Sequence, residues 1–294
     1  MLPSSVAERE NTFELVLGDP DYPEQLRRTP DPPRRLFGIG DPGLLVPGLA
    51  VIGSRKSTPY GRAAARLFAG WAAAAGIVVV SGAAVGCDQA AHRAALDVRG
   101  STVAVLGCGA DIDYPKGAAD LLAQIRCVGC VVSEQPWGAP PLRWAFARRN
   151  RIIAGLAHAV LVVEASVPSG TFSTADAAAD AGRDVLAVPG SIFAPECRGA
   201  NRLIRQGAIP ITEVDDLVRA LEIQDRVSDH ADPLSLYSES REDPLLAALV
   251  ANPMRPDDIA NEFGLDIIET VRRLSRLEAD GLVSRLADGR YARA

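Results

Sequence analysis

The sequence lacks any apolar run long enough to span a membrane. Its longest apolar stretch, residues 68–80, is rich in alanine and is interrupted by Gly70 and Gly76, whereas a spanning helix needs roughly 18 or more apolar residues in a row. The chain begins MLPSSVAERENTFELV, without the basic-then-apolar pattern of an export signal. We therefore expect a cytoplasmic protein with no membrane partner.

Cysteine and histidine are scarce. Five cysteines are an odd number, which argues against a disulfide framework in a protein that is not exported. Cys127 and Cys130 form a CxxC pair without a second pair at zinc-binding spacing, so we expect them to be structural. The three histidines form no HExxH pattern, and His158 is expected to be packed. Asp111 and Asp113 are expected to cap a turn, so we predict no metal site.

Motifs of the common nucleotide-dependent enzymes are also missing. No GxGxxG is followed about twenty residues later by a ribose-binding acid, and there is no GxxxxGK[ST] loop. No Ser–His–Asp or Cys–His grouping is evident. NAD-dependent and Walker-type ATPase chemistry are therefore disfavoured, and we predict no cofactor and no catalytic activity.

The net charge of −6 is unusual for a protein that binds a polyanion, but it is unevenly distributed. Residues 1–212 carry 21 basic and 19 acidic side chains, whereas residues 213–243 carry 3 and 10, and residues 244–294 carry 7 and 8. Most of the excess acid is therefore confined to one short segment. Because local patches decide binding, this composition does not exclude a nucleic acid partner.

Apolar, β-branched segments recur about every 25 residues from residue 49 onward. Near-continuous apolarity is typical of strands buried on both faces, and the spacing leaves room for a helix between successive strands. The pattern predicts an α/β fold with a Rossmann-like, doubly wound, mostly parallel sheet. The expected strands are 49–54, 77–81, 102–107, 130–134, 159–165, 184–190 and 208–212, and the expected helices are 60–75, 87–98, 117–126, 171–182 and 199–206.

The composition divides the chain into four parts. Residues 1–47 are rich in proline and charge and are predicted to be an extended lead-in with little regular structure. Residues 48–224 are predicted to form the Rossmann-like domain. Residues 225–243 are polar and acidic and are predicted to be a linker. A small domain is expected at residues 244–294.

This last part has the pattern of a winged helix-turn-helix. Three helical segments are followed by LVSRLADGRYAR, which predicts a hairpin with Asp288-Gly289 at its turn. The third helix carries Arg272, Arg273 and Arg276, but it also carries four acids. Duplex DNA binding and a protein-contact role therefore both remain open.

Candidate binding residues lie where strands end, as ligands do in doubly wound sheets. The turn after the first predicted strand of the sheet reads GSRKSTPYGR. Gly53 lets a backbone approach an anion, Ser54 donates a hydrogen bond, and Arg55 and Lys56 supply positive charge. Two further turns of small residues enter helices, and their candidate residues are Ser81, Gly82, Ser169, Gly170 and Thr171. Such turns can surround one or more phosphates.

The segment PLRWAFARRNRIIAG, residues 141–155, contains four arginines and no acid. Arginine forms bidentate contacts with phosphate, and an aromatic ring can stack on an unpaired base. Interleaved aromatics favour single-stranded over duplex nucleic acid. At least one of these arginines, Arg149 or Arg151, is expected to pair internally, for example with Glu134 or Glu164. The candidate binding residues are Phe146, Arg148, Arg149, Asn150 and Arg151.

Together these stretches resemble the DprA/Smf family of DNA-processing proteins. The resembling segments are VIGSRKSTPYG, SGAAVGCDQAAH, VAVLGCGADIDYP, SEQPWG, FARRNRIIAGL, VLVVEASVPSGTFSTADAAADAGRDVLAVPG and GANRLIRQGA. The resemblance implies an extended Rossmann core that binds single-stranded DNA without catalysis, hands the strand to the RecA recombinase in natural transformation, and forms a homodimer. It places the family's phosphate-contacting arginine at Arg55, its stacking aromatic at Phe146, and a basic position and an asparagine at Arg148 and Asn150.

The chain departs from the family pattern at three positions. Where the family has an arginine followed by Gly-Ile-Asp, this chain has Val85-Gly86-Cys87-Asp88. The turn that reads SGSLITA in the family reads SGTFSTA here, with the larger Phe172, and Ala147 stands where the family has a proline. Two alternatives stay open. PSGTFSTADAA loosely resembles the glycine-rich turn of nucleotide phosphoribohydrolases, and the C-terminal module would also suit a winged-helix transcription regulator.

Overall fold

The computed structural model describes residues 11–221 and 243–293, and it centres on a nine-stranded sheet in the order β1-β2-β6-β5-β4-β3-β7-β8-β9. The seven strands from β6 to β9 in that order run parallel, so the predicted mostly parallel sheet is confirmed. The strands are β1 Thr12–Val16, β2 Arg35–Gly40, β3 Gly48–Gly53, β4 Val79–Ser81, β5 Thr102–Leu106, β6 Cys130–Ser133, β7 Ala157–Glu164, β8 Asp184–Ala187 and β9 Ile209–Pro210.

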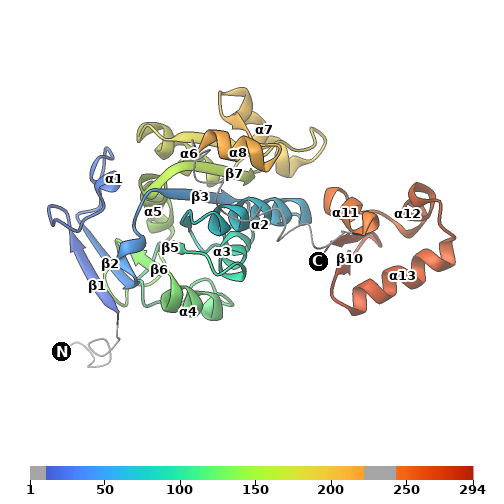
Figure 1. Cartoon of the computed structure of the whole chain (residues 1–294), viewed down its shortest axis with the longest axis horizontal. Helices are drawn as coiled ribbons and strands as arrows, with labels where there is room; N and C mark the ends of the chain where they lie inside the picture. The colour runs from blue at the N-terminus through green and yellow to red at the C-terminus, as the bar shows by residue number, and fades with distance from the viewer. Residues whose placement is uncertain (1–10, 222–242, 294) are drawn as a thin grey trace.

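Helices cover both faces of the sheet (Figure 1). One layer consists of α1 Glu24–Arg27, α5 Arg143–Leu156, α6 Thr171–Asp180 and α7 Arg198–Arg205. The other consists of α2 Pro59–Ala74, α3 Cys87–Asp97, α4 Ala119–Val128 and α8 Val214–Ala220. Successive side chains of a strand point to opposite faces. Thus Ala50 and Ile52 of β3 join the first layer, and Leu49 and Val51 join the second.

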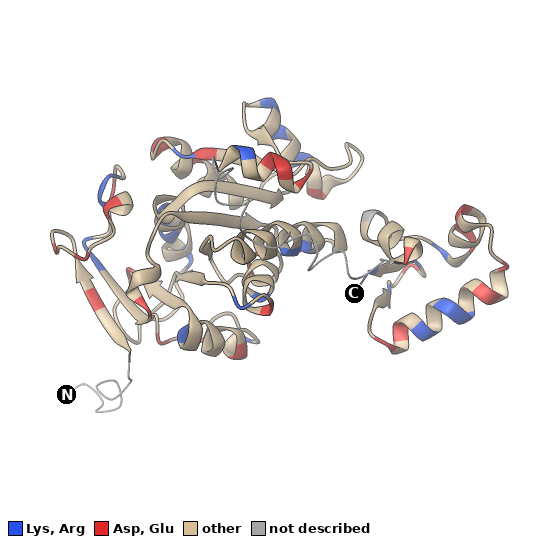
Figure 2. Ribbon diagram, viewed as in Figure 1, with Lys and Arg blue, Asp and Glu red and all other residues tan. Residues whose placement is uncertain are grey.

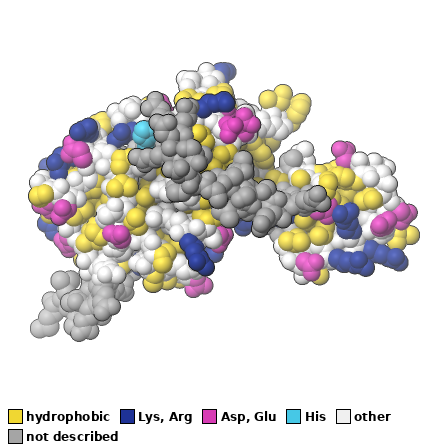
Figure 3. All heavy atoms as spheres, in the orientation of Figure 1, with side chains coloured by type: hydrophobic (Ala, Val, Ile, Leu, Met, Phe, Trp, Pro, Cys, Tyr) yellow, Lys and Arg dark blue, Asp and Glu magenta, His cyan; other side chains and the backbone are white. Residues whose placement is uncertain are grey.

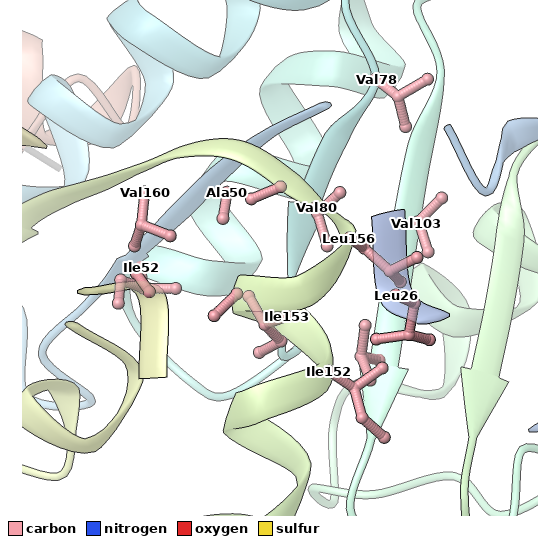
Figure 4. Close-up of a cluster of buried hydrophobic side chains, with 14 of the residues drawn as sticks. Leu26, Ala50, Ile52, Val78, Val80, Val103, Ile152, Ile153, Leu156 and Val160 are labelled. Carbon is pink, nitrogen blue, oxygen red and sulfur yellow. The ribbon is translucent and has the colours of Figure 1, made fainter. Parts of the chain in front are cut away.

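The helix that matters most for the site, α5, is anchored by its apolar C-terminal half. Ile152, Ile153 and Leu156 are almost completely buried against strand residues that include Ile52 and Val80 (Figure 4). Burying each such side chain contributes about 1.5–3 kcal/mol. The polar N-terminal half of α5 is therefore held at a fixed position beside the sheet.

The prediction that residues 1–47 have little regular structure is wrong for residues 11–47, the part that the structure describes. β1 and β2 pair antiparallel, and β2 pairs antiparallel with β6 through Phe37 and Ser133. Leu26 of α1 is fully buried, and a Cβ at Gly155 of α5 would lie 2.5 Å from its Cδ1 atom. The prolines that suggested an extended segment lie between the short elements rather than inside the strands, so they do not interrupt the pairing.

The C-terminal module has the predicted winged-helix order: α11 Pro244–Ala251, α12 Pro256–Phe263, α13 Ile267–Ala279, and a hairpin of β10 Val283–Arg285 and β11 Tyr291–Arg293. Asp266 caps α13 by accepting hydrogen bonds from the Ile268 and Glu269 amides. Hydrophobic and basic side chains both reach the module's surface (Figure 3). Nearly all of the predicted linker lies outside the described residues.

Among the described residues, no helix combines the length and hydrophobicity needed to cross a bilayer. His158 is exposed rather than packed as predicted, because its side chain leaves the sheet near the start of β7. The five cysteines are all free thiols, and four of them are buried.

Candidate nucleic-acid interface

A cavity of about 490 Å³ opens beyond the carboxyl ends of β3 and β7. Ligands bind at this position in doubly wound sheets, because the turns that leave neighbouring parallel strands meet there. The cavity is lined by the turn after β3, by one face of α5 and by the turn that enters α6. Ten of the fourteen predicted site residues contribute: Gly53, Ser54, Arg55, Lys56, Phe146, Arg149, Asn150, Ser169, Gly170 and Thr171.

The turn after β3 presents two exposed cations, Arg55 and Lys56. The Ser54 hydroxyl accepts a hydrogen bond from the Lys56 amide at 3.1 Å, which tightens the turn. A Cβ at Gly53 would lie 2.7 Å from the Cys87 sulfur. Glycine is therefore needed here for close packing against α3 as well as for an open approach to the turn.

A buried carboxylate fixes the position of this turn by hydrogen bonds. Glu164, at the end of β7, accepts hydrogen bonds from the Thr58 amide at 2.9 Å and from its hydroxyl at 2.6 Å. Burial raises the pKa of Glu164, and the bonds from Thr58 oppose that shift. Gly61 leaves room for the carboxylate, since a Cβ there would lie 2.5 Å from Oε2. Glu164 thus positions the turn rather than pairing with an arginine of α5.

One face of α5 forms the second wall. Arg143, Phe146, Ala147 and Asn150 line the cavity, and their spacing of three and four residues places them on the same side of a helix. The ring of Phe146 lies between two groups: its centroid is 5.7 Å from the Arg55 guanidinium carbon and 5.3 Å from the Tyr114 centroid.

Among the wall residues that the prediction missed, Arg143 is the one exposed cation. It is exposed and belongs to the arginine-rich segment, and its position three residues before Phe146 is the signal that would have found it. Gly107 makes room for the Phe146 ring, because a Cβ there would lie 2.8 Å from the ring. Trp144 is 55% exposed and does not line the cavity.

The third wall is the start of α6. Ser169, Gly170 and Thr171 line the cavity, and the Thr171 amide donates to the Ser169 hydroxyl at 3.2 Å. Asn150 donates to the Ser173 hydroxyl at 2.7 Å and so joins α5 to α6. The first amides of a helix have no partners within it and carry partial positive charge, so this end of α6 suits an anion.

Arg149 forms part of the cavity floor, but it is only 5% exposed. Its guanidinium donates to the carbonyl oxygens of Gly82 and Val105, at the ends of β4 and β5. Asp88 lies nearby and accepts from the Gly82 and Ala84 amides. Burial lowers the pKa of Arg149 to about 10 and raises the pKa of Asp88. Arg149 therefore ties strand ends together beneath the cavity.

Four predicted site residues, Ser81, Gly82, Arg148 and Arg151, do not line the cavity. Arg151 pairs with Glu134 at 2.7 Å and with Asp31 at 2.7 Å, so the predicted internal pairing is found here. Arg148 pairs with the same Glu134 at 3.1 Å, because it lies on a different face of α5 from Phe146. Ser81 is fully buried and donates to the Val51 carbonyl at 2.6 Å.

The described residues contain no group of three or more His, Cys, Asp or Glu side chains that could hold a metal ion. The two carboxylates predicted to cap a turn instead contact partners outside that turn. Asp111 accepts from the Gly138 amide at 2.9 Å, and Asp113 pairs with Arg126 at 2.7 Å.

A doubly wound sheet whose carboxyl edge carries an open, cationic cavity with an aromatic wall defines a Rossmann-like nucleic-acid-processing protein. The comparisons specify which one. The family model described as DNA recombination-mediator protein A matches residues 14–222, and the model of the DprA winged helix domain matches residues 230–289. The chain belongs to this DprA/Smf family.

Individual relatives agree with this membership. The chain is 40% identical to Protein Smf of Escherichia coli over 276 residues, which covers 91% of this chain and 74% of that protein. A DprA structure from Streptococcus pneumoniae has 39% identity and a TM-score of 0.68, and the match covers 72% of this chain and 75% of that one. A Helicobacter pylori DprA structure, described for its single-stranded DNA binding mode, has 28% identity and a TM-score of 0.65, with coverage of 74% and 97%.

Proposed function

We propose that this protein binds single-stranded DNA in the cavity, without sequence preference. The observation that carries the proposal is the arrangement of Arg55, Lys56 and Arg143 around an opening whose wall is Phe146. Cations contact phosphates and an aromatic ring stacks on any base, since every base has a π-face. The H. pylori DprA, whose structure is described for this activity, supports the proposal.

The groups around the cavity favour binding over catalysis. Asp88 is the one acidic residue of the lining, and it is buried and engaged by two backbone amides. Cys87 is buried, and burial raises the pKa of its thiol. The phosphoribohydrolase alternative requires a catalytic acid in the α6 turn, but Asp176 does not line the cavity. We therefore propose a protein without enzymatic activity.

We further propose that the bound strand is passed to a RecA recombinase and that the chain acts as a homodimer. Both follow from the resemblance to DprA/Smf proteins, and the match over both domains supports them. Pull-down of RecA in the presence of dT oligomers and light scattering of the protein alone test these two parts separately.

The DNA-binding proposal is tested by fluorescence anisotropy with labelled dT oligomers and with a duplex of equal length. Wild type should prefer the single strand, and Arg55→Glu should abolish binding without unfolding the protein. Arg148→Ala is the matched control, because Arg148 lies outside the cavity and Glu134 keeps Arg151 as its partner. Incubation with AMP tests the enzyme alternative: release of free base would refute the proposed function.

A further inference from the structure

The loop between β8 and α7 holds two large apolar side chains in solvent. Ile192 is 75% exposed and Phe193 is 86% exposed, the highest values among the large hydrophobic residues that the structure describes. Exposing adjacent apolar groups of this size is unfavourable in water, and such groups mark sites of interaction.

Hydrogen bonds fix the conformation of this loop. Asn201 of α7 donates to the Gly190 carbonyl at 2.9 Å and accepts from the Gly190 amide at 3.1 Å. At the tip, the Ala194 amide donates to the Ser191 carbonyl at 3.1 Å, and the Phe193 amide donates to the Ser191 hydroxyl at 3.3 Å. The exposure of the tip is thus built into an ordered turn.

The loop is connected to the DNA cavity on two sides. The hydroxyl of Tyr60, in the first turn of α2, donates to the Pro189 carbonyl at 2.6 Å. The Gly199 amide donates to the Ala165 carbonyl at 2.7 Å, directly before the turn that lines the cavity. β7 and β8 are paired neighbours, so their carboxyl ends lie about 5 Å apart. The loop therefore begins at the strand next to β7, whose end borders the cavity.

Positive charge accompanies the apolar tip. Residues 189–205 contain three arginines and one glutamate, and the ribbon of α7 is coloured for basic residues in Figure 2. Arg198 and Arg202 are exposed, and Arg202 lies 5.5 Å from the Phe172 ring of α6. Exposed arginines beside an exposed aromatic ring suit a continuing sugar–phosphate chain with unpaired bases.

We propose that Ile192 and Phe193 form a second base-stacking site for the same DNA strand, next to the cavity. This inference rests on the proposed function. Phe193 stacks on an unpaired base that lies beyond the cavity, Ile192 packs against its edge, and Arg198 and Arg202 contact the adjoining phosphates. The site extends the length of strand that one protein molecule covers.

The test compares dT oligomers of about 4 and about 16 nucleotides. Phe193→Ala should leave the affinity for the short oligomer unchanged and weaken binding of the long one by about 5- to 150-fold. Phe193→Trp should bind the long oligomer as tightly as wild type does. The fluorescence of the introduced tryptophan should be quenched when the long oligomer binds. Val128→Ala is the matched control, because Val128 is 64% exposed at the opposite edge of the sheet.

Each result has a distinct meaning. If wild type and Phe193→Ala bind the long oligomer equally well, this inference is wrong. The proposed function still holds in that case, provided that Arg55→Glu abolishes binding of both oligomers. Should Phe193→Ala instead change only the oligomeric state measured by light scattering, the tip is a protein contact and the inference is wrong. Should Arg55→Glu bind both oligomers like wild type, the proposed function itself fails.

Discussion

Arg55→Ala should make DNA binding measurably less dependent on salt. Three exposed cations line the cavity, namely Arg55, Lys56 and Arg143. If each neutralises one phosphate, the logarithm of the binding constant falls with the logarithm of salt concentration at a slope of about −2.1. Affinity then drops about 18-fold between about 50 and 200 mM salt. Removing one cation makes the slope shallower, at about −1.4, and the loss of affinity over the same salt range becomes about 7-fold.

Fluorescence anisotropy titrations of a labelled dT oligomer at a series of NaCl concentrations measure these slopes directly. Arg148→Ala should keep the wild-type slope, because its guanidinium is engaged by Glu134 outside the cavity. The reasoning is refuted if Arg55→Ala leaves the slope unchanged, or if Arg148→Ala makes the slope as shallow as Arg55→Ala does.

Three further predictions concern residues packed around the sheet and the cavity. His92 is buried, and burial lowers its pKa to about 3. The unfolded chain therefore takes up a proton below about pH 6.5 that the folded chain does not. Stability should fall by about 2 kcal/mol from pH 7 to 5, and His92→Gln should lack this loss in urea titrations. Arg149→Met should destabilise the fold by about 1–3 kcal/mol for each of the buried Gly82 and Val105 carbonyls that loses its donor, whereas Arg148→Met should stay within about 0.5 kcal/mol in the same assay. Gly107→Ala should displace the Phe146 ring and weaken dT binding; unchanged anisotropy curves would contradict this.

The parallel sheet was predictable because its strands are buried on both faces. Continuous apolar runs such as residues 159–163 have no polar position that would allow another reading, and the observed β7 contains all of these residues. The winged helix was predictable for a related reason: helix periodicity and an Asp-Gly turn are local signals.

Elements whose form depends on distant partners were missed. β2 lies in a segment rich in proline and charge, and its pairing with β6 joins segments about 90 residues apart. Helix α5 was not among the predicted helices, because its segment was considered only for its arginines and aromatic residues. Its apolar positions nevertheless follow a helical period. Within the site, sequence could single out Arg149 and Arg151 as candidates for internal pairing, but it could not show that Arg148 shares Glu134 with Arg151. Their roles are decided by the face of α5 that each occupies.

The carboxylate of Glu164 has a consequence for the energetics of binding. It fixes the turn after β3 through Thr58 before any ligand arrives, so little backbone entropy remains to be lost when a strand is captured. Binding that needs no folding step proceeds at a rate set by diffusion and electrostatic steering. Association measured by stopped flow should therefore be fast and follow a single phase at low salt. Glu164→Gln should lower the association rate while leaving the folded structure unchanged.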